Sequence, residues 1–324
     1  MITRKRINQY KKWFKNLSFF EYNTFILDYI EYLWSLVNYI EKKYKNLYEE
    51  LHFSMNYSKL SKNGVIKLVD EFYKSHNIDL NVYDLINQDI LCIKTEEKEK
   101  DAFFETKHDG ESFYDENNNK RIIIKLEGTI FDAAVIIHEL SHYRNQPDGK
   151  RNFISDLFTE ALAYANELIF FEDLKDTKYL KDRNLHFTGI MFLMYSYAYN
   201  IHYIYKMIML YKKENNITKL LHKKLFKTDD YDAMLYDFEK YVSQNRLVVR
   251  DTWFVIGLPL AIYMLEEYMK DKNFFDRLEK FNIDINEKSL WECLKAINVN
   301  GMDDLINKIK SSTNSYIETL IKIK

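Results

Sequence analysis

The chain has 324 residues, of which 47% are hydrophobic and 30% charged, and its formal net charge is -2 at pH 7. This composition excludes an intrinsically disordered chain, and the charge balance offers no global field that would attract nucleic acid. Because the chain contains only 7 Gly and 2 Pro, we expect a mainly α-helical fold, organised as a single domain over 1–324.

The chain shows no sign of export or of membrane insertion. The basic start of the sequence lacks the apolar core of a secretory signal. The longest apolar stretch, VIGLPLAIYML at 255–265, is too short to span a bilayer and contains Pro259. Cys92 and Cys293 are too few for a disulfide framework. We therefore expect a cytoplasmic protein without a transmembrane segment.

The first hundred residues are predicted to be helical. Apolar residues recur at alternating steps of four and three between Ile26 and Leu51, which indicates an amphipathic helix. SKNG at 61–64 has the composition of a turn, and helical spacing resumes over 65–75. A helical hairpin followed by the charged connection KTEEKEKD at 94–101 is therefore expected.

The next segment changes to β-prone sequence. Short runs rich in β-branched and aromatic residues are separated by HDG at 108–110 and ENNN at 116–119, which are turn signals. We expect a sheet of two or three strands that ends in RIIIKL at 121–126. That last strand could align an extended peptide by strand addition.

Two helices are predicted after this sheet. Thr129 is a plausible N-cap, with Asp132 three residues later in the arrangement of a capping box, and the first helix should run over about 130–144. QPDGK at 146–150 ends it with turn residues. The second helix covers 153–174, and the segments after Asn184 also have helical character.

The first of these helices carries VIIHELSHY at 135–143. Residues four apart lie on one face of a helix, so His138 and His142 can converge on a single tetrahedral ion. Glu139 is offset around the helix and can reach a water molecule rather than the ion. An H-E-x-x-H pattern is typical of zinc hydrolases. The alternative is a buried helix that carries two histidines with ordinary hydrogen bonds.

The second helix offers a third ligand, because a catalytic zinc needs three protein ligands and an open position. Glu160 lies among small alanines that would let the two helices approach closely, and a buried carboxylate there needs a partner such as a cation. Glu160 could instead be an exposed charge on an amphipathic face. Glu167, two turns further on the same face, could orient a ligating histidine or be an ordinary surface residue. The other histidines lack ligand spacing and are interpreted as structural or surface residues: His52, His76, His108, His202 and His222.

GTIFDAAVIIHELSH, the following RNQP, and FTEALAYANELIFFE resemble the zinc-binding region of the oligoendopeptidase F and thimet oligopeptidase family. The resemblance implies that His138, His142 and Glu160 bind one zinc ion per chain. It also implies that Glu139 is the general base and Glu167 a supporting carboxylate. The family prefers oligopeptides because a helical channel excludes folded proteins. The chain is shorter than most members, and the spacing from His142 to Glu160 approaches that of other gluzincins.

The segment LHFTGIMFLMYSYAYNIHYIY at 185–205 resembles the family's tyrosine-bearing helix. Tyr197 and Tyr195 fall near the positions that stabilise the oxyanion, and His186 could hydrogen-bond to the substrate. The alternatives are an aromatic core stripe for the tyrosines and a structural role for His186. A rival alignment places 253–277 against the final helices of the family.

These observations predict a helical zincin-type metallopeptidase with a small β-sheet beside the H-E-x-x-H helix. It would consist of N-terminal helices (1–100), the sheet with the zinc-binding helices (101–182), and C-terminal helices (183–324). The expected function is zinc-dependent hydrolysis of peptide bonds in oligopeptides. The alternatives are a metalloprotease specialised for one protein target and a non-catalytic protein that binds zinc or peptides. An intact Glu139 argues against the last, because a structural site needs no base.

Overall fold

The computed structural model describes residues 56–94, 110–116, 119–145, 153–194, 247–284, 288 and 290–322. The chain divides into two units, one formed by Met1–Glu49 with Phe192–Ile256 and the other by Glu50–Met191 with Gly257–Lys324. Nearly all described residues belong to the second, larger unit, whose architecture follows. The predicted amphipathic helix over 26–51, the turn at 146–150, and Tyr195 and Tyr197 lie outside the described residues. The single-domain organisation stays a prediction.

Helices make up most of the described chain, which confirms the predicted mainly α-helical class. In chain order they are α4 (Lys62–Ser75), α5 (Val82–Asn87), α6 (Phe131–Asn145), α7 (Phe153–Asp173), α11 (Leu247–Lys270), α12 (Phe274–Asp284), α13 (Leu290–Ala296) and α14 (Met302–Lys322). A further helix begins at 180 and continues to 194, the last described residue of that stretch. Within the described ranges, no helix has an apolar stretch long enough to cross a membrane.

The sheet has three strands in the order β1-β3-β2. β1 (Leu91–Lys94) pairs parallel with β3 (Lys120–Lys125), and β2 (Gly110–Tyr114) pairs antiparallel with β3 on its other side. The prediction that RIIIKL could accept a peptide strand is therefore wrong, because β3 is the central strand and both of its edges are occupied. Among the described strands, β1 and β2 form the edges.

Two expected turns belong to regular elements instead. Gly110, interpreted as part of a turn, is the first residue of β2. SKNG at 61–64 is the start of α4, where the side chain of Ser61 accepts a hydrogen bond from the backbone N–H of Gly64. In both places a glycine suggested a turn, whereas the backbone is an ordinary strand or helix start.

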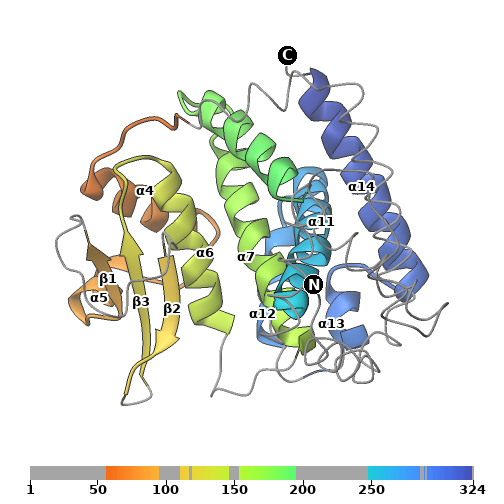
Figure 1. Ribbon diagram of the computed structural model, residues 1–324, viewed down its shortest axis with the longest axis horizontal. Helices are drawn as coiled ribbons and strands as arrows, with labels where there is room; N and C mark the ends of the chain where they lie inside the picture. The colour runs from red at the N-terminus through yellow and green to blue at the C-terminus, as the bar shows by residue number, and fades with distance from the viewer. Residues whose placement is uncertain are drawn as a thin grey trace, which may run out of the picture. The chain divides into compact units, whose positions relative to one another are not determined.

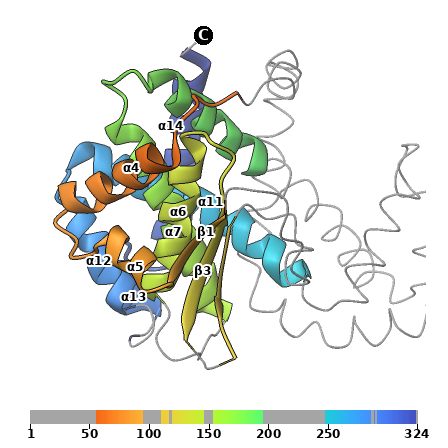
Figure 2. The same ribbon diagram turned by 90° about the vertical axis from the view of Figure 1, so that its left-hand side faces the viewer.

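α6 lies between the sheet and α7 (Figures 1 and 2), and both the sheet and α7 contact it. Ile122 and Ile124 of β3 are fully buried on one face of the sheet, and Ala133, Ile136 and Ile137 of α6 are fully buried as well. Burial on opposite sides explains why α6 shows almost no polar face. The helix that carries H-E-x-x-H is thus packed on both sides in the interior of the larger unit.

The start of α6 is fixed by Asp132 rather than by Thr129. The carboxylate of Asp132 accepts hydrogen bonds from the backbone N–H groups of Glu127, Gly128 and Thr129, at 3.0, 2.8 and 3.0 Å. The buried hydroxyl of Thr129 has no hydrogen-bond partner among the described residues. The hydrogen bond from the Thr129 backbone N–H to Asp132, which a capping box requires, is therefore present. The predicted cap by the Thr129 hydroxyl is wrong. Asp132 ties the chain leaving β3 directly to the start of α6.

Candidate metal centre

Three predicted side chains meet between α6 and α7. The Nε2 atoms of His138 and His142 are 3.0 Å apart. The Oε2 atom of Glu160 lies 3.7 Å from Nε2 of His138, and its Oε1 atom lies 3.7 Å from Nε2 of His142. The potential ligand atoms of these residues all lie within 4.8 Å of one another. We name this group the metal centre, defined by His138, His142 and Glu160.

The spacing of the donor atoms fits a four-coordinate ion. In a tetrahedral zinc site with bonds of about 2.0–2.1 Å, ligand atoms are about 3.3 Å apart. The observed separations of 3.0 and 3.7 Å lie on either side of that value. Two imidazole nitrogens and one carboxylate are also the donor types of catalytic zinc sites. The arrangement is therefore compatible with a metal ion and leaves a fourth position for a small ligand.

Small residues and a buried hydrogen bond hold α6 and α7 together at this point. Ala161, Ala163 and Ala165 of α7 are fully buried, which agrees with the close approach that the sequence predicted. The side-chain amide of Asn166 donates to the hydroxyl of Ser141 at 2.7 Å. Ser141 itself donates to the carbonyl of Ile137. This link fixes the register between the two helices one residue before His142.

Glu167 supports His138 from the side opposite the metal centre. Its Oε1 atom accepts a hydrogen bond from Nδ1 of His138, and the Glu167 side chain is only 7% exposed. Burial alone would lower the pKa of His138, but the charge and hydrogen bond of Glu167 outweigh it and raise that pKa to about 9 in the metal-free protein. Because Nδ1 donates to a carboxylate, Nε2 is the nitrogen that can bind an ion.

His186 is a second histidine next to Glu167, a contact that the sequence analysis did not predict. Its Nε2 atom lies 3.3 Å from Oε2 of Glu167. The ring is buried and stacks on Phe171 at a centroid distance of 4.4 Å. Burial lowers the pKa of His186 to about 4, so the ring is neutral near pH 7. These contacts favour the structural interpretation of His186 over direct contact with a substrate.

Glu139 lies next to the metal centre but outside its donor set. It is buried, and burial raises its pKa, reinforced by the charges of Glu167 and Glu111. The charge of His138 and a hydrogen bond from Ser112 act in the opposite direction. A carboxylate with a raised pKa holds a proton more readily than an ordinary glutamate. Such a group is suited to accept and return a proton near neutral pH.

The edge strand β2 passes close to Glu139. A Cβ atom added to Gly110 would lie 2.7 Å from Cδ1 of Ile124, 2.9 Å from Cγ1 of Val135 and 3.0 Å from Cγ of Glu139. All three contacts are shorter than side chains normally tolerate. The absence of a side chain at Gly110 therefore permits this approach of strand and helix.

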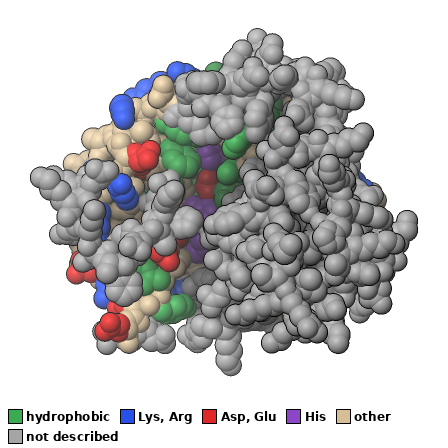
Figure 3. All heavy atoms as spheres, in the orientation of Figure 1, with side chains coloured by type: hydrophobic (Ala, Val, Ile, Leu, Met, Phe, Trp, Pro, Cys, Tyr) green, Lys and Arg blue, Asp and Glu red, His purple; other side chains and the backbone are tan. Residues whose placement is uncertain are grey.

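Tyr164 is a further neighbour of the centre, with its ring 4.9 Å from the ring of His138 in an edge arrangement. It lies one turn after Glu160 on α7, and that spacing was the available sequence signal for it. Figure 3 shows histidine and acidic side chains together near the middle of one face of the molecule, next to hydrophobic ones. The side chains of His138 and Glu160 are 14% and 20% exposed.

No known family model matches the chain, and no curated protein matches its sequence. Solved structures do match its fold. A Bacillus anthracis protein assigned as an oligoendopeptidase F matches with a TM-score of 0.53 and 12% identity, over 82% of this chain and 48% of that one. A Chlamydophila abortus protein assigned as a peptidase matches with a TM-score of 0.56 and 13% identity, over 92% and 55%. PZ peptidase A in complex with an inhibitor matches with a TM-score of 0.53 and 14% identity, over 82% and 50%.

The likeness confirms the fold that the sequence resemblance implied, a mainly helical peptidase fold with a small sheet. At 12–14% identity the match concerns the fold alone. The chain spans about half the length of these solved structures.

Proposed function

We propose that this chain is a zinc-dependent peptidase in which His138, His142 and Glu160 hold one zinc ion and Glu139 is the general base. The observation that carries the proposal is the convergence of three donor atoms within 4.8 Å. A buried carboxylate with a raised pKa lies directly beside them. The fold likeness to structures named as peptidases supports the same conclusion.

The chemistry divides between the ion and Glu139. A zinc ion bound here would supply Lewis acidity, which polarises the scissile carbonyl and lowers the pKa of water toward about 7. Glu139 takes a proton from the attacking water and later delivers it to the leaving amine. Glu167 keeps Nδ1 of His138 protonated and its ring in position. Tyr197 and Tyr195 remain the proposed donors to the oxyanion.

The proposed substrates are short, unstructured peptides. An extended peptide can add to the edge of a sheet through main-chain hydrogen bonds. β2 offers such an edge, and its first residue, Gly110, lies against Glu139. We therefore assign to β2 the role that the sequence analysis gave to RIIIKL. The preference for oligopeptides follows from the family resemblance.

The test compares two histidine variants of the full-length chain. His142→Ala should lose bound zinc, measured by mass spectrometry of the metal, and should lose turnover of a quenched peptide mixture. His76→Ala is the matched control, because the His76 side chain is only 8% exposed, similar to the 10% of His142, but contacts Asp173 instead; it should keep its zinc. His142→Ala with one zinc per chain would refute the metal assignment.

The same preparation separates the alternatives. Zinc-loaded protein that cleaves none of the peptides would indicate a non-catalytic binding protein. Equal cleavage of a flexible peptide and of a folded domain that carries the same sequence in a surface loop would indicate a protease directed at proteins.

A further inference from the structure

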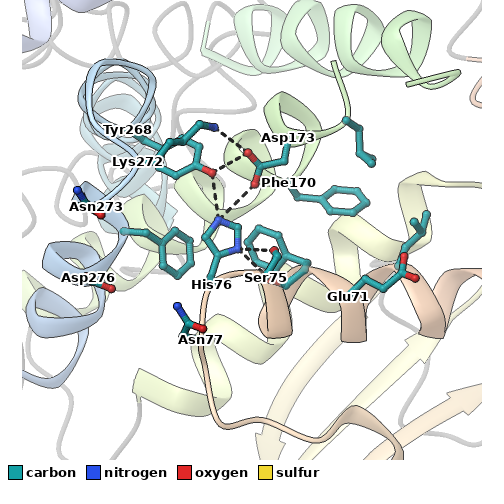
Figure 4. A pocket seen from close by; sticks show the side chains of 14 residues that line it. Glu71, Ser75, His76, Asn77, Phe170, Asp173, Tyr268, Lys272, Asn273 and Asp276 are labelled. Atoms are coloured by element: carbon teal, nitrogen blue, oxygen red, sulfur yellow. Dashed lines mark hydrogen bonds and ion pairs between the residues drawn. The ribbon is translucent and has the colours of Figure 1, made fainter. Parts of the chain in front are cut away.

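A second polar cluster lies at the C-terminal end of α7, away from the metal centre. Asp173 is about 20 Å along the helix axis from Glu160. It lines a pocket of about 540 Å³ formed by the ends of α4, α7 and α11 and the start of α12. Figure 4 shows Asp173, His76, Tyr268 and Lys272 converging in this pocket. We call these four residues the Asp173 cluster.

The inner wall of the pocket is a hydrogen-bonded network. Nδ1 of His76 donates to the carbonyl of Phe72 at 2.8 Å, and Nε2 lies 3.2 Å from Oδ2 of Asp173. The hydroxyl of Tyr268 donates to Oδ1 of Asp173 at 2.6 Å. The ring of His76 also packs 3.9 Å from that of Phe275. These contacts hold the Asp173 carboxylate and the ring of Tyr268 in fixed positions.

The ammonium group of Lys272 already lies between the carboxylate of Asp173 and the ring of Tyr268. Its Nζ atom lies 2.8 Å from Oδ1 of Asp173 and 3.7 Å from the centroid of the Tyr268 ring. A carboxylate and an aromatic face are together a recognised binding arrangement for organic cations. The Lys272 side chain is 55% exposed and lies in the turn between α11 and α12. The Lys272 side chain can therefore move away from Asp173 and Tyr268 without unfolding a helix.

The charges around the pocket favour a cation from outside. Glu71 of α4 and Asp276 of α12 also line it, which gives three carboxylates with Asp173. Burial would raise the pKa of Asp173, but hydrogen bonds from His76, Lys272 and Tyr268 lower it below its ordinary value. Asp173 is therefore ionised at neutral pH. Among the residues that line the pocket, these three carboxylates outnumber the one ammonium of Lys272, and Glu71 also pairs with Lys67 at 3.5 Å.

We propose that this pocket binds the guanidinium group of an arginine in a peptide, and that Lys272 is an internal competitor for the same position. A planar guanidinium stacks on aromatic rings and pairs with carboxylates through two hydrogen bonds, which suits walls made of Phe72, Phe275 and Tyr268. Asn77 and Asn273 also line the pocket and carry amide groups that can hydrogen-bond to a peptide backbone.

The test measures binding of N-acetyl-arginine methylamide to the full-length chain by titration calorimetry at low salt. The citrulline analogue, of the same shape but uncharged, is the control ligand. Lys272→Met keeps the aliphatic stem and removes the ammonium, so the arginine probe should bind about tenfold more tightly than to the wild type. The citrulline analogue should bind both proteins more weakly than the arginine probe does.

Two further variants test the other carboxylates of the pocket and leave the hydrogen bonds of Asp173 in place. Glu71→Gln and Asp276→Asn change exposed side chains and should each weaken binding of the arginine probe about twofold to fivefold. Equal binding of the two probes, or unchanged affinity in Lys272→Met, would overturn the proposal. Affinities should be the same with and without zinc, because the pocket is separate from the metal centre. Failure here therefore leaves the proposed peptidase function untouched.

Discussion

The metal centre and the Asp173 cluster each combine a carboxylate of α7 with histidine from another element, yet they are built differently. His76 turns both ring nitrogens toward acceptors, the carbonyl of Phe72 and the carboxylate of Asp173. His138 turns Nδ1 toward the carboxylate of Glu167, whereas its Nε2 faces Nε2 of His142 at 3.0 Å and Oε2 of Glu160 at 3.7 Å. Two imidazole nitrogens that face each other favour a shared cation, whereas both nitrogens of His76 already have oxygen partners within the protein.

The source of positive charge also differs between the two clusters. Lys272 brings an ammonium to Asp173, so that cluster holds its own cation. In the metal centre the converging atoms are imidazole nitrogens and carboxylate oxygens, and we propose that a metal ion supplies the charge. The direction in which each histidine nitrogen points therefore distinguishes the two kinds of site better than the residue types do.

The largest expected effect distinguishes the two clusters by their chemistry, since Glu139, the proposed base, lies beside the metal centre. Glu139→Gln should lower kcat for peptide cleavage by about 10³- to 10⁴-fold, because an amide cannot accept the proton of the attacking water. Zinc content and thermal stability should stay close to those of the wild type. Steady-state kinetics with metal analysis checks both. A variant that keeps even a tenth of wild-type kcat would remove Glu139 from the mechanism.

The next effect tests whether Glu167 belongs to the metal centre. Glu167→Ala should weaken zinc binding by about 10- to 100-fold, because His138 loses the carboxylate that orients its ring. Competition with a fluorescent chelator measures the affinity. Glu172→Ala is the matched control, since Glu172 is equally buried on α7 but binds Arg183. If both variants weaken zinc equally, the effect of Glu167 is structural.

The smallest effect concerns the Asp173 cluster and its pH dependence. Because the pKa of Asp173 is lowered in the folded chain, its stabilisation is complete above the unfolded value of about 3.9 and is lost as the pH falls further. Asp173→Asn should therefore lower the free energy of unfolding at pH 7 by about 1–3 kcal/mol. Urea unfolding should show the difference shrinking below pH 4. A constant difference across that range would mean that the charge of Asp173 does not contribute.

Local sequence patterns were enough to predict the helices that carry the metal centre. The expected helix over about 130–144 is observed at Phe131–Asn145, and the expected helix over 153–174 at Phe153–Asp173. Spacing by four residues brings His138 and His142 together without any knowledge of the fold. Glu160 could be selected because a carboxylate among alanines needs a partner.

Long-range contacts could not be predicted in this way. β1 pairs parallel with a strand far along the chain, so no hairpin turn marks it in the sequence. His76 meets Asp173 and Tyr268 from three different helical regions, and none of the three stands out by local periodicity. The contact of His186 with Glu167 likewise depends on packing between helices. Sequence spacing therefore identified the donors of the metal centre but not the residues that surround them.

The position of Gly110 sets a limit on how the sequence can vary. Even a methyl group there would lie within 3.0 Å of Ile124, Val135 and Glu139 at the same time, and Ile124 is fully buried. Because Cγ of Glu139 is one of the three crowded atoms, a larger residue at 110 disturbs the proposed base together with the packing of Ile124 and Val135. In a library that carries every amino acid at this position, folded variants should therefore outnumber active ones. The close approach of β2 to α6 therefore depends on the absence of a side chain at Gly110.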